Sequence, residues 1–108
     1  MADLVKYKRP SEDYDVTMSF SDKLASTESV DTVVNGSSVT ALDSSGASAT
    51  STVLGTVTPS AQTLKVHVTA GTNLEDYTVT FHAKATTSGD EYEKVLLLRV
   101  RTQIEGSF

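Results

Sequence analysis

The chain of 108 residues contains no cysteine. Disulfide bonds, thiolate metal sites and thiol catalysis are therefore excluded. Small secreted domains usually depend on disulfides, so their absence favours folding in a reducing cytoplasm. No apolar run approaches the ~20 residues that a membrane-spanning helix requires, and no leading apolar segment indicates a secretion signal. We therefore expect a protein without a membrane partner.

Positive charge is also scarce, because 9 Lys and Arg stand against 14 Asp and Glu and give a formal net charge of -5. Binding to a phosphate backbone needs clustered Lys and Arg side chains, so nucleic acid is not an expected partner. The acidity is interpreted as a means of solubility. The chain length is typical of a single domain with one hydrophobic core.

Several segments alternate apolar and polar residues with the two-residue period of a half-buried strand. The clearest are residues 14–20, 64–68, 77–85 and 95–101, and weaker ones lie near 29–34, 39–42 and 50–57. No segment keeps a helical period. Turn residues such as Asn35-Gly36 separate the runs. This spacing predicts an all-β fold, an immunoglobulin-like Greek-key β-sandwich of about seven antiparallel strands. The expected structural positions are Phe20, Val66, Tyr77, Val79, Phe81 and Leu98.

The two ends of the chain lack this alternation. We expect a flexible basic N-terminal tail over residues 1–11, the sandwich over 12–103 and a C-terminal tail over 104–108. The serine-rich stretch 35–60 fits either ordered strand or mobile loop. Three basic residues in the first tail, Lys6, Lys8 and Arg9, are candidates for contacting an acidic partner surface, the alternative being a solvated tail.

A tyrosine at the start of the third alternating run has a specific interpretation. An acidic residue, then Tyr77, then apolar Val79 and Phe81 after a glycine-containing loop resembles the tyrosine corner of Greek-key sandwiches. There, the tyrosine hydroxyl bonds to backbone upstream in the chain. The alternative is an amphipathic residue at a strand start.

The chain offers little for catalysis. Its two histidines, His67 and His82, lie on the polar faces of expected strands, where they could be cross-strand neighbours and form a two-histidine metal site. Solvated strand positions are the alternative. The acidic groups around residues 12–22 and 90–93 lack the ligand spacing of a calcium loop. We therefore expect a protein that is not an enzyme, with no catalytic, cofactor-binding or metal-binding residues.

Two blocks of the sequence resemble short bacteriophage proteins with an immunoglobulin-like fold that are encoded among virion structural genes. The first block comprises residues 8–10, 13–15 and 20–24, ending in Phe-Ser-Asp-Lys-Leu. The second comprises residues 68–80, 85–89 and 98–101. Members commonly carry tryptophan in the first block, and this chain has none. The resemblance implies a role in the virion or in its assembly.

The leading hypothesis is therefore a non-enzymatic phage or prophage structural or accessory protein. It would bind other phage structural proteins through loops, tails or an edge strand. We expect it in the virion, or in the host cytoplasm during assembly, with a homo-oligomer as one further form. The alternative is a carbohydrate- or cell-surface-binding β-sandwich module, for which Tyr7, Tyr92 and Phe108 are the free aromatic side chains. An enzyme is the third hypothesis, and it depends on the histidine pair.

Overall fold

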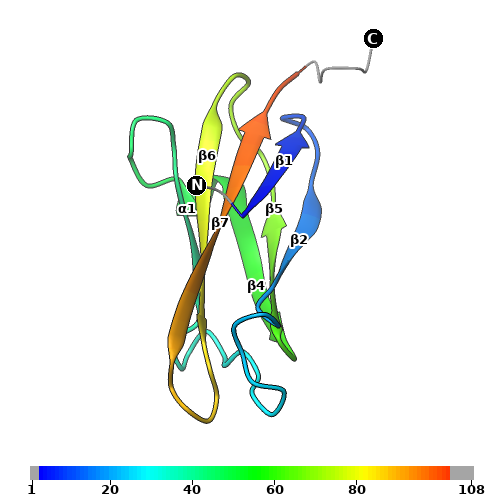
Figure 1. Ribbon diagram of the computed structural model, residues 1–108. Helices are drawn as coiled ribbons and strands as arrows, with labels where there is room; N and C mark the ends of the chain where they lie inside the picture. The colour runs from blue at the N-terminus through cyan, green and yellow to red at the C-terminus, as the bar shows by residue number, and fades with distance from the viewer. Residues whose placement is uncertain (1–2, 103–108) are drawn as a thin grey trace.

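The computed structural model describes residues 3–102, which form two β-sheets and one short helix (Figure 1). Sheet A consists, in spatial order, of β1 (Leu4–Lys8), β7 (Glu91–Val100), β6 (Asp76–Lys84) and β3 (Ser38–Leu42). Sheet B consists of β2 (Tyr14–Ser19), β5 (Thr63–Val68) and β4 (Leu54–Ser60). The helix α1 (Thr50–Val53) precedes β4. The prediction of an all-β sandwich is confirmed.

The pairing of the first strand differs from the prediction of an entirely antiparallel fold. β1 pairs in parallel with β7, whereas the other strand pairs are antiparallel. The orders β2-β5-β4 and β7-β6-β3 are compatible with the B-E-D and G-F-C sheets of immunoglobulin-like sandwiches. The immunoglobulin-like Greek-key assignment itself stays a prediction. The molecule is elongated, with extents of 46 × 27 × 23 Å, so its loops fall at two separate ends.

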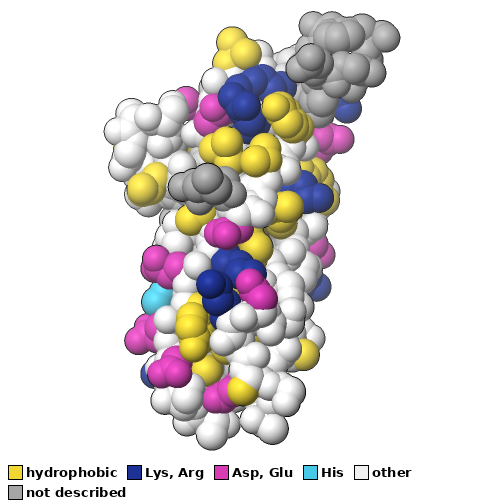
Figure 2. Space-filling view, viewed as in Figure 1, with side chains coloured by type: hydrophobic (Ala, Val, Ile, Leu, Met, Phe, Trp, Pro, Cys, Tyr) yellow, Lys and Arg dark blue, Asp and Glu magenta, His cyan; other side chains and the backbone are white. Residues whose placement is uncertain are grey.

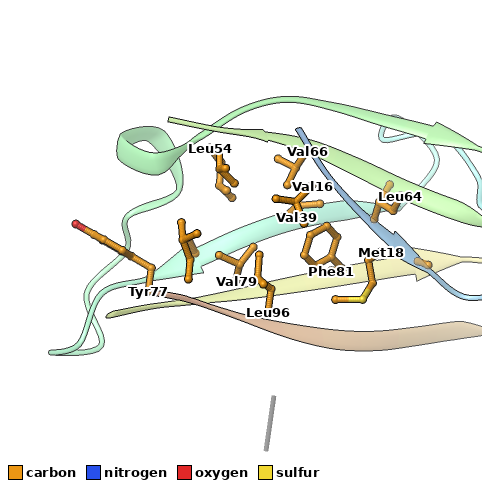
Figure 3. Close-up of a cluster of buried hydrophobic side chains, with 14 of the residues drawn as sticks. Val16, Met18, Val39, Leu54, Leu64, Val66, Tyr77, Val79, Phe81 and Leu96 are labelled. Carbon is orange, nitrogen blue, oxygen red and sulfur yellow. The ribbon is translucent and has the colours of Figure 1, made fainter. Parts of the chain in front are cut away.

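The core lies between the two sheets and is formed by every second residue of their strands. Phe81 of β6 has no exposed surface and lies close to Met18 and Val39 in the close-up view (Figure 3). The six structural positions expected from the sequence have exposed fractions of 0–3%. Alternation along each strand is therefore what directs the hydrophobic side chains inward.

Residues 4–8, which the sequence analysis placed in a flexible tail, form β1 instead. The strand is held by Lys8, which is fully buried. Its Nζ donates hydrogen bonds to the carbonyl oxygens of Arg9 at 2.8 Å, Pro10 at 3.3 Å and Ala70 at 2.5 Å. A buried ammonium group is tolerated when acceptors surround it. The tail assignment was wrong for these residues because Lys8 contributes to the structure.

The three basic candidates for a partner contact thus have different surroundings. Lys8 is withdrawn from the surface, so its assignment as an interaction residue was wrong. Burial lowers the pKa of Lys8, against the opposing effect of Asp13 and Glu12. Lys6 is exposed on β1, and Arg9 pairs with Glu12 at 3.9 Å. The expected C-terminal tail, residues 104–108, lies outside the described residues.

The predicted weak strand over residues 29–34 is absent, because local side-chain hydrogen bonds favour a turn there. Asp31 Oδ1 accepts the backbone N–H of Thr32 at 2.8 Å and the side-chain amide of Asn35 at 3.1 Å. From this stretch only Val30 makes an isolated bridge, to Ala85.

The predicted strand over residues 50–57 is divided. Its first half is the single helical turn α1, and its second half belongs to β4. Thr50 Oγ1 accepts the backbone N–H of Ala41 at 3.0 Å, which supplies an edge bond to β3. The sequence did not determine whether residues 35–60 form ordered strand or mobile loop. In the structure they contain β3, α1 and β4.

The loop before β6 makes the contact that a tyrosine corner predicts. The hydroxyl of Tyr77 accepts the backbone N–H of Thr72, five residues upstream, at 3.0 Å. Gly71 has a φ of +98°, and a Cβ at that position would lie 2.9 Å from Val100 Cγ2. A glycine is therefore required for the loop to close over β7.

Candidate functional site

Three connecting loops meet at one end of the sandwich, the lower end in Figure 1. They are residues 20–37 between β2 and β3, residues 61–62 between β4 and β5, and residues 85–90 between β6 and β7. We call these segments together the loop platform. Loops carried on a rigid sandwich are the usual place of recognition in this architecture.

A glutamine side chain joins the second loop to the first. The Nε2 of Gln62 donates to the carbonyl oxygens of Ala25 at 2.7 Å and Glu28 at 3.1 Å. The backbone N–H of Val30 donates to the carbonyl of Ala61 at 2.8 Å. The long loop is thus anchored at several points along its length and not only where it leaves the strands.

A glutamate side chain joins the first loop to the third. The carboxylate of Glu28 accepts the backbone N–H groups of Thr87 at 2.8 Å and Ser88 at 2.9 Å. These bonds, that from Thr87 most strongly, lower the pKa of Glu28. The N–H of Thr86 donates to the carbonyl of Ser29 at 3.0 Å. The platform is therefore ordered before any partner binds, which reduces the entropy lost on association.

The platform presents two adjacent valines. Val34 is 95% exposed and Val33 is 47% exposed, on a turn held by the carboxylate of Asp31. The hydrogen bond from Asn35 is the strongest influence on the pKa of Asp31 and lowers it. An apolar side chain held fully in water at the tip of a braced loop is suited to burial against another protein.

Sequence reasoning missed this site. None of its interaction candidates lies on the platform. Lys6 and Lys8 belong to β1, and Lys8 and Arg9 lie near Ala70 at the opposite end of the sandwich. The signal was the pair Val33-Val34 directly before Asn35-Gly36, which was interpreted as the end of a strand. Its β-branched residues favour a strand, whereas the flanking Asp and Asn side chains favour a turn.

The two histidines are not neighbours. His67 belongs to β5 in sheet B, where its Nδ1 lies 2.9 Å from Asp15 Oδ1. His82 belongs to β6 in sheet A, where its Nε2 lies 2.5 Å from Glu91 Oε1 and its Nδ1 lies 3.2 Å from Glu93 Oε2. The two-histidine site that the sequence left open is therefore not formed, because strand alternation specifies which face a residue lies on but not which sheet its strand joins.

The flanking carboxylates make His82 a titrating group with a testable shift. The hydrogen bond to Glu91 is the largest influence on the pKa of His82 and raises it, outweighing desolvation. Because the folded-state pKa is above the unfolded value, the stabilisation is complete below about pH 6.5 and is lost as pH rises through the folded-state pKa. An NMR titration should find the pKa lowered by Glu91→Gln combined with Glu93→Gln. An unchanged pKa would contradict the pairing.

Among residues 3–102, no group of three or more His, Cys, Asp or Glu side chains could hold a metal ion. Within the same range there is no pocket, and no helix has the length and hydropathy needed to span a bilayer. Of the free aromatics expected from the sequence, Tyr7 is 45% exposed, Tyr92 packs partly against the core, and Phe108 lies outside the described residues.

Comparison with known proteins identifies a family. A family model described as podophage GP4 fiber-tail adaptor protein gp77 matches residues 8–99, which is most of the chain. No curated protein and no solved structure matches. The matched segment includes the loop platform and the strands from β2 to β6, together with most of β7. The resemblance to phage structural proteins is confirmed, and the chain belongs to the podophage GP4 fiber-tail adaptor gp77 family.

Proposed function

We propose that this protein is a non-enzymatic structural subunit of a phage particle that joins other virion proteins, with the loop platform as one of its contact surfaces. The family supports a structural role. The observation that carries the proposal is the set of bonds from Glu28 and Gln62 that brace the loop bearing Val34. A binding surface of this kind needs no reactive group.

The loop platform needs little change of conformation to bind a partner. Its loops are already joined through Glu28 and Gln62, so a partner meets an ordered surface. Full burial of a valine side chain stabilises a complex by roughly 1.5–3 kcal/mol. Val34, at 95% exposure, has almost all of that contribution available. The serine and threonine hydroxyls around it suit a polar rim.

Val34→Asp is expected to weaken incorporation into particles by about tenfold or more, since burial of a charge replaces burial of a methyl pair. The measurement is the amount of each variant in purified phage particles. These particles are produced in host cells that express the variant in place of the unmodified protein. The matched control is Leu74→Asp, because Leu74 is 74% exposed at the other end of the sandwich. Thermal unfolding of both variants verifies that they fold.

Two results would contradict the proposal. Absence of the unmodified protein from particles and from assembly intermediates would remove the structural role. If Val34→Asp is incorporated as well as the unmodified chain, the loop platform is not a contact surface, while the structural role supported by the family still stands. The carbohydrate-binding alternative gains no support, because exposed Tyr7 has no second exposed ring beside it among the described residues.

A further inference from the structure

The outward-facing residues of β7 follow a pattern that is opposite in charge at its two ends. They are two acids, then two apolar residues, then two bases, the last lying just beyond the strand: Glu91, Glu93, Val95, Leu97, Arg99 and Arg101. The intervening residues Leu96, Leu98 and Val100 face the core with no exposed surface. We call the surface on which this series lies the outer face of sheet A.

Neighbouring strands widen the apolar centre. Val5 of β1 is the register partner of Leu97, and Thr78 of β6 lies on the other side of Leu97, with Leu42 of β3 beyond it. Val5 is 48% exposed and Leu42 is 46% exposed. Two residues before Leu97 on β7, the backbone N–H of Val95 donates to the carboxylate of Asp3 at 2.8 Å. An apolar strip, interrupted by Thr78, thus crosses the sheet perpendicular to its strands.

The basic end is built around one carboxylate. Asp76 of β6 lies 2.9 Å from Arg101 Nη2 and 3.4 Å from Arg99 Nε, and the guanidinium of Arg99 lies 5.8 Å from the ring centroid of Tyr7. Desolvation acts to raise the pKa of Asp76, but the bonds from Arg101 and Arg99 outweigh it and lower that pKa. One negative charge for two positive charges leaves this end net positive.

The acidic end has the opposite balance. Glu91 and Glu93 flank His82, and Lys84 is the register partner of Glu91. At a pH above the raised pKa of His82 the imidazole is neutral, and two negative charges then stand against one positive charge. In Figure 2, Asp and Glu side chains gather around the histidine at the lower left, while Lys and Arg side chains gather near the top with hydrophobic side chains beside them. The two ends therefore carry opposite net charge when His82 is neutral.

We propose that the outer face of sheet A binds a second copy of this chain, with the two sheets stacked face to face and their β7 strands antiparallel. A two-fold axis across the middle of β7 brings the outward-facing residues of β7 opposite their complements. Arg101 of one copy then faces Glu91 of the other, Arg99 faces Glu93, and Leu97 faces Val95. This contact is separate from the loop platform and does not depend on the proposed function.

The charges select the orientation, and the apolar strip supplies most of the attraction. Stacking with the β7 strands parallel would place Glu91 and Glu93 against the same acids of the other copy, and like charges in contact oppose association. Exposed ion pairs contribute only about 0–1 kcal/mol each, so they would not hold the copies together unaided. Val5 and Leu42, each about half exposed, and the partly buried Val95 and Leu97 provide the surface removed from water.

The experiment is sedimentation equilibrium of the full chain and two double variants, at concentrations up to about 1 mM, where weak association is detectable. The unmodified chain should form a dimer. Glu91→Lys with Glu93→Lys makes the face basic at both ends, and Arg99→Glu with Arg101→Glu makes it acidic at both ends. Each variant alone should lose at least about tenfold in affinity. An equimolar mixture of the two should form a heterodimer, because their faces are then complementary.

The matched control is Asp13→Lys with Asp15→Lys, which makes the same change in net charge on residues 13–15, at and before the start of β2 in sheet B. It should dimerise as the unmodified chain does. Circular dichroism verifies that each variant is folded. The proposal is overturned by a monomer over the whole concentration range, by undiminished dimerisation of the acid-to-lysine variant, or by a mixture that stays monomeric.

Discussion

Replacing Phe81 with alanine is expected to lower the free energy of unfolding by about 3–5 kcal/mol, because a deleted ring loses its transfer energy and leaves a cavity. The ring has no exposed surface, and Val39 is the register partner of Phe81. Figure 3 shows Met18 on another side of the ring. A folded domain of this size has a total stability of roughly 5–15 kcal/mol, so the loss is large but compatible with folding.

The measurement is chemical denaturation, with the midpoint and its slope fitted for each variant. His82→Ala is the neighbouring comparison, because His82 faces outward and its loss should change stability by less than about 1 kcal/mol. Phe81→Leu keeps most of the volume and should lose less than the alanine variant. Equal losses at Phe81 and His82 would show that the assigned facing of β6 is wrong.

Lys8→Met is expected to destabilise the protein by about 1–3 kcal/mol, although it exchanges a charged side chain for an apolar one. The methionine retains a flexible stem of similar length, but it cannot donate to the carbonyl oxygens of Arg9, Pro10 and Ala70. Buried acceptors without a donor account for the loss. The amides of β1 should also exchange faster with solvent, as the strand separates from β7 more often.

Lys6→Met is the matched comparison, since it makes the same chemical change two residues earlier on the same strand. Lys6 is exposed, so its replacement should change stability by no more than about 0.5 kcal/mol. The measurement is the difference in the free energy of unfolding between the two variants. A Lys8→Met variant as stable as Lys6→Met would mean that the ammonium group does not anchor the loop at Ala70.

The strands with one polar face were predictable, and the reason is visible in their alternation. Tyr14–Ser19, Thr63–Val68 and Asp76–Lys84 each place apolar side chains inward at every second residue. This pattern is a property of a single segment, so it can be detected without knowing the neighbours. The buried position of Leu98 followed from the same alternation.

The first strand was not predictable in this way, because its inward positions include a lysine. Leu4, Lys6 and Lys8 share one side of β1, but Lys6 is exposed and only Lys8 is buried, and a strand with lysines on this side resembles a solvated tail. Lys8 can occupy its position only because Ala70, 62 residues away in the sequence, supplies an acceptor. Such a contact depends on the completed fold and leaves no local signal.

Local sequence patterns could not predict which strands share a sheet or where the candidate site lies, because both depend on contacts between residues far apart in the sequence. The loops of the platform are brought together by the pairing of β2 with β5 and of β3 with β6. The bond from Glu28 to Thr87 spans 59 residues, and no spacing rule links those two positions. The sequence does contain the charge series along β7, but its significance depends on which sheet carries the strand and on what lies beside it.

The parallel pairing of β1 with β7 has a mechanical consequence. The chain enters the fold at Leu4 and leaves it past Val100, and these two strands are adjacent. A pulling force applied to both ends of the chain would slide β1 and β7 past each other along their length. It would load the evenly spaced bonds between them together, in shear, and not one after another as in peeling. The two ends of the chain are thus joined by the contact best placed to resist tension along it.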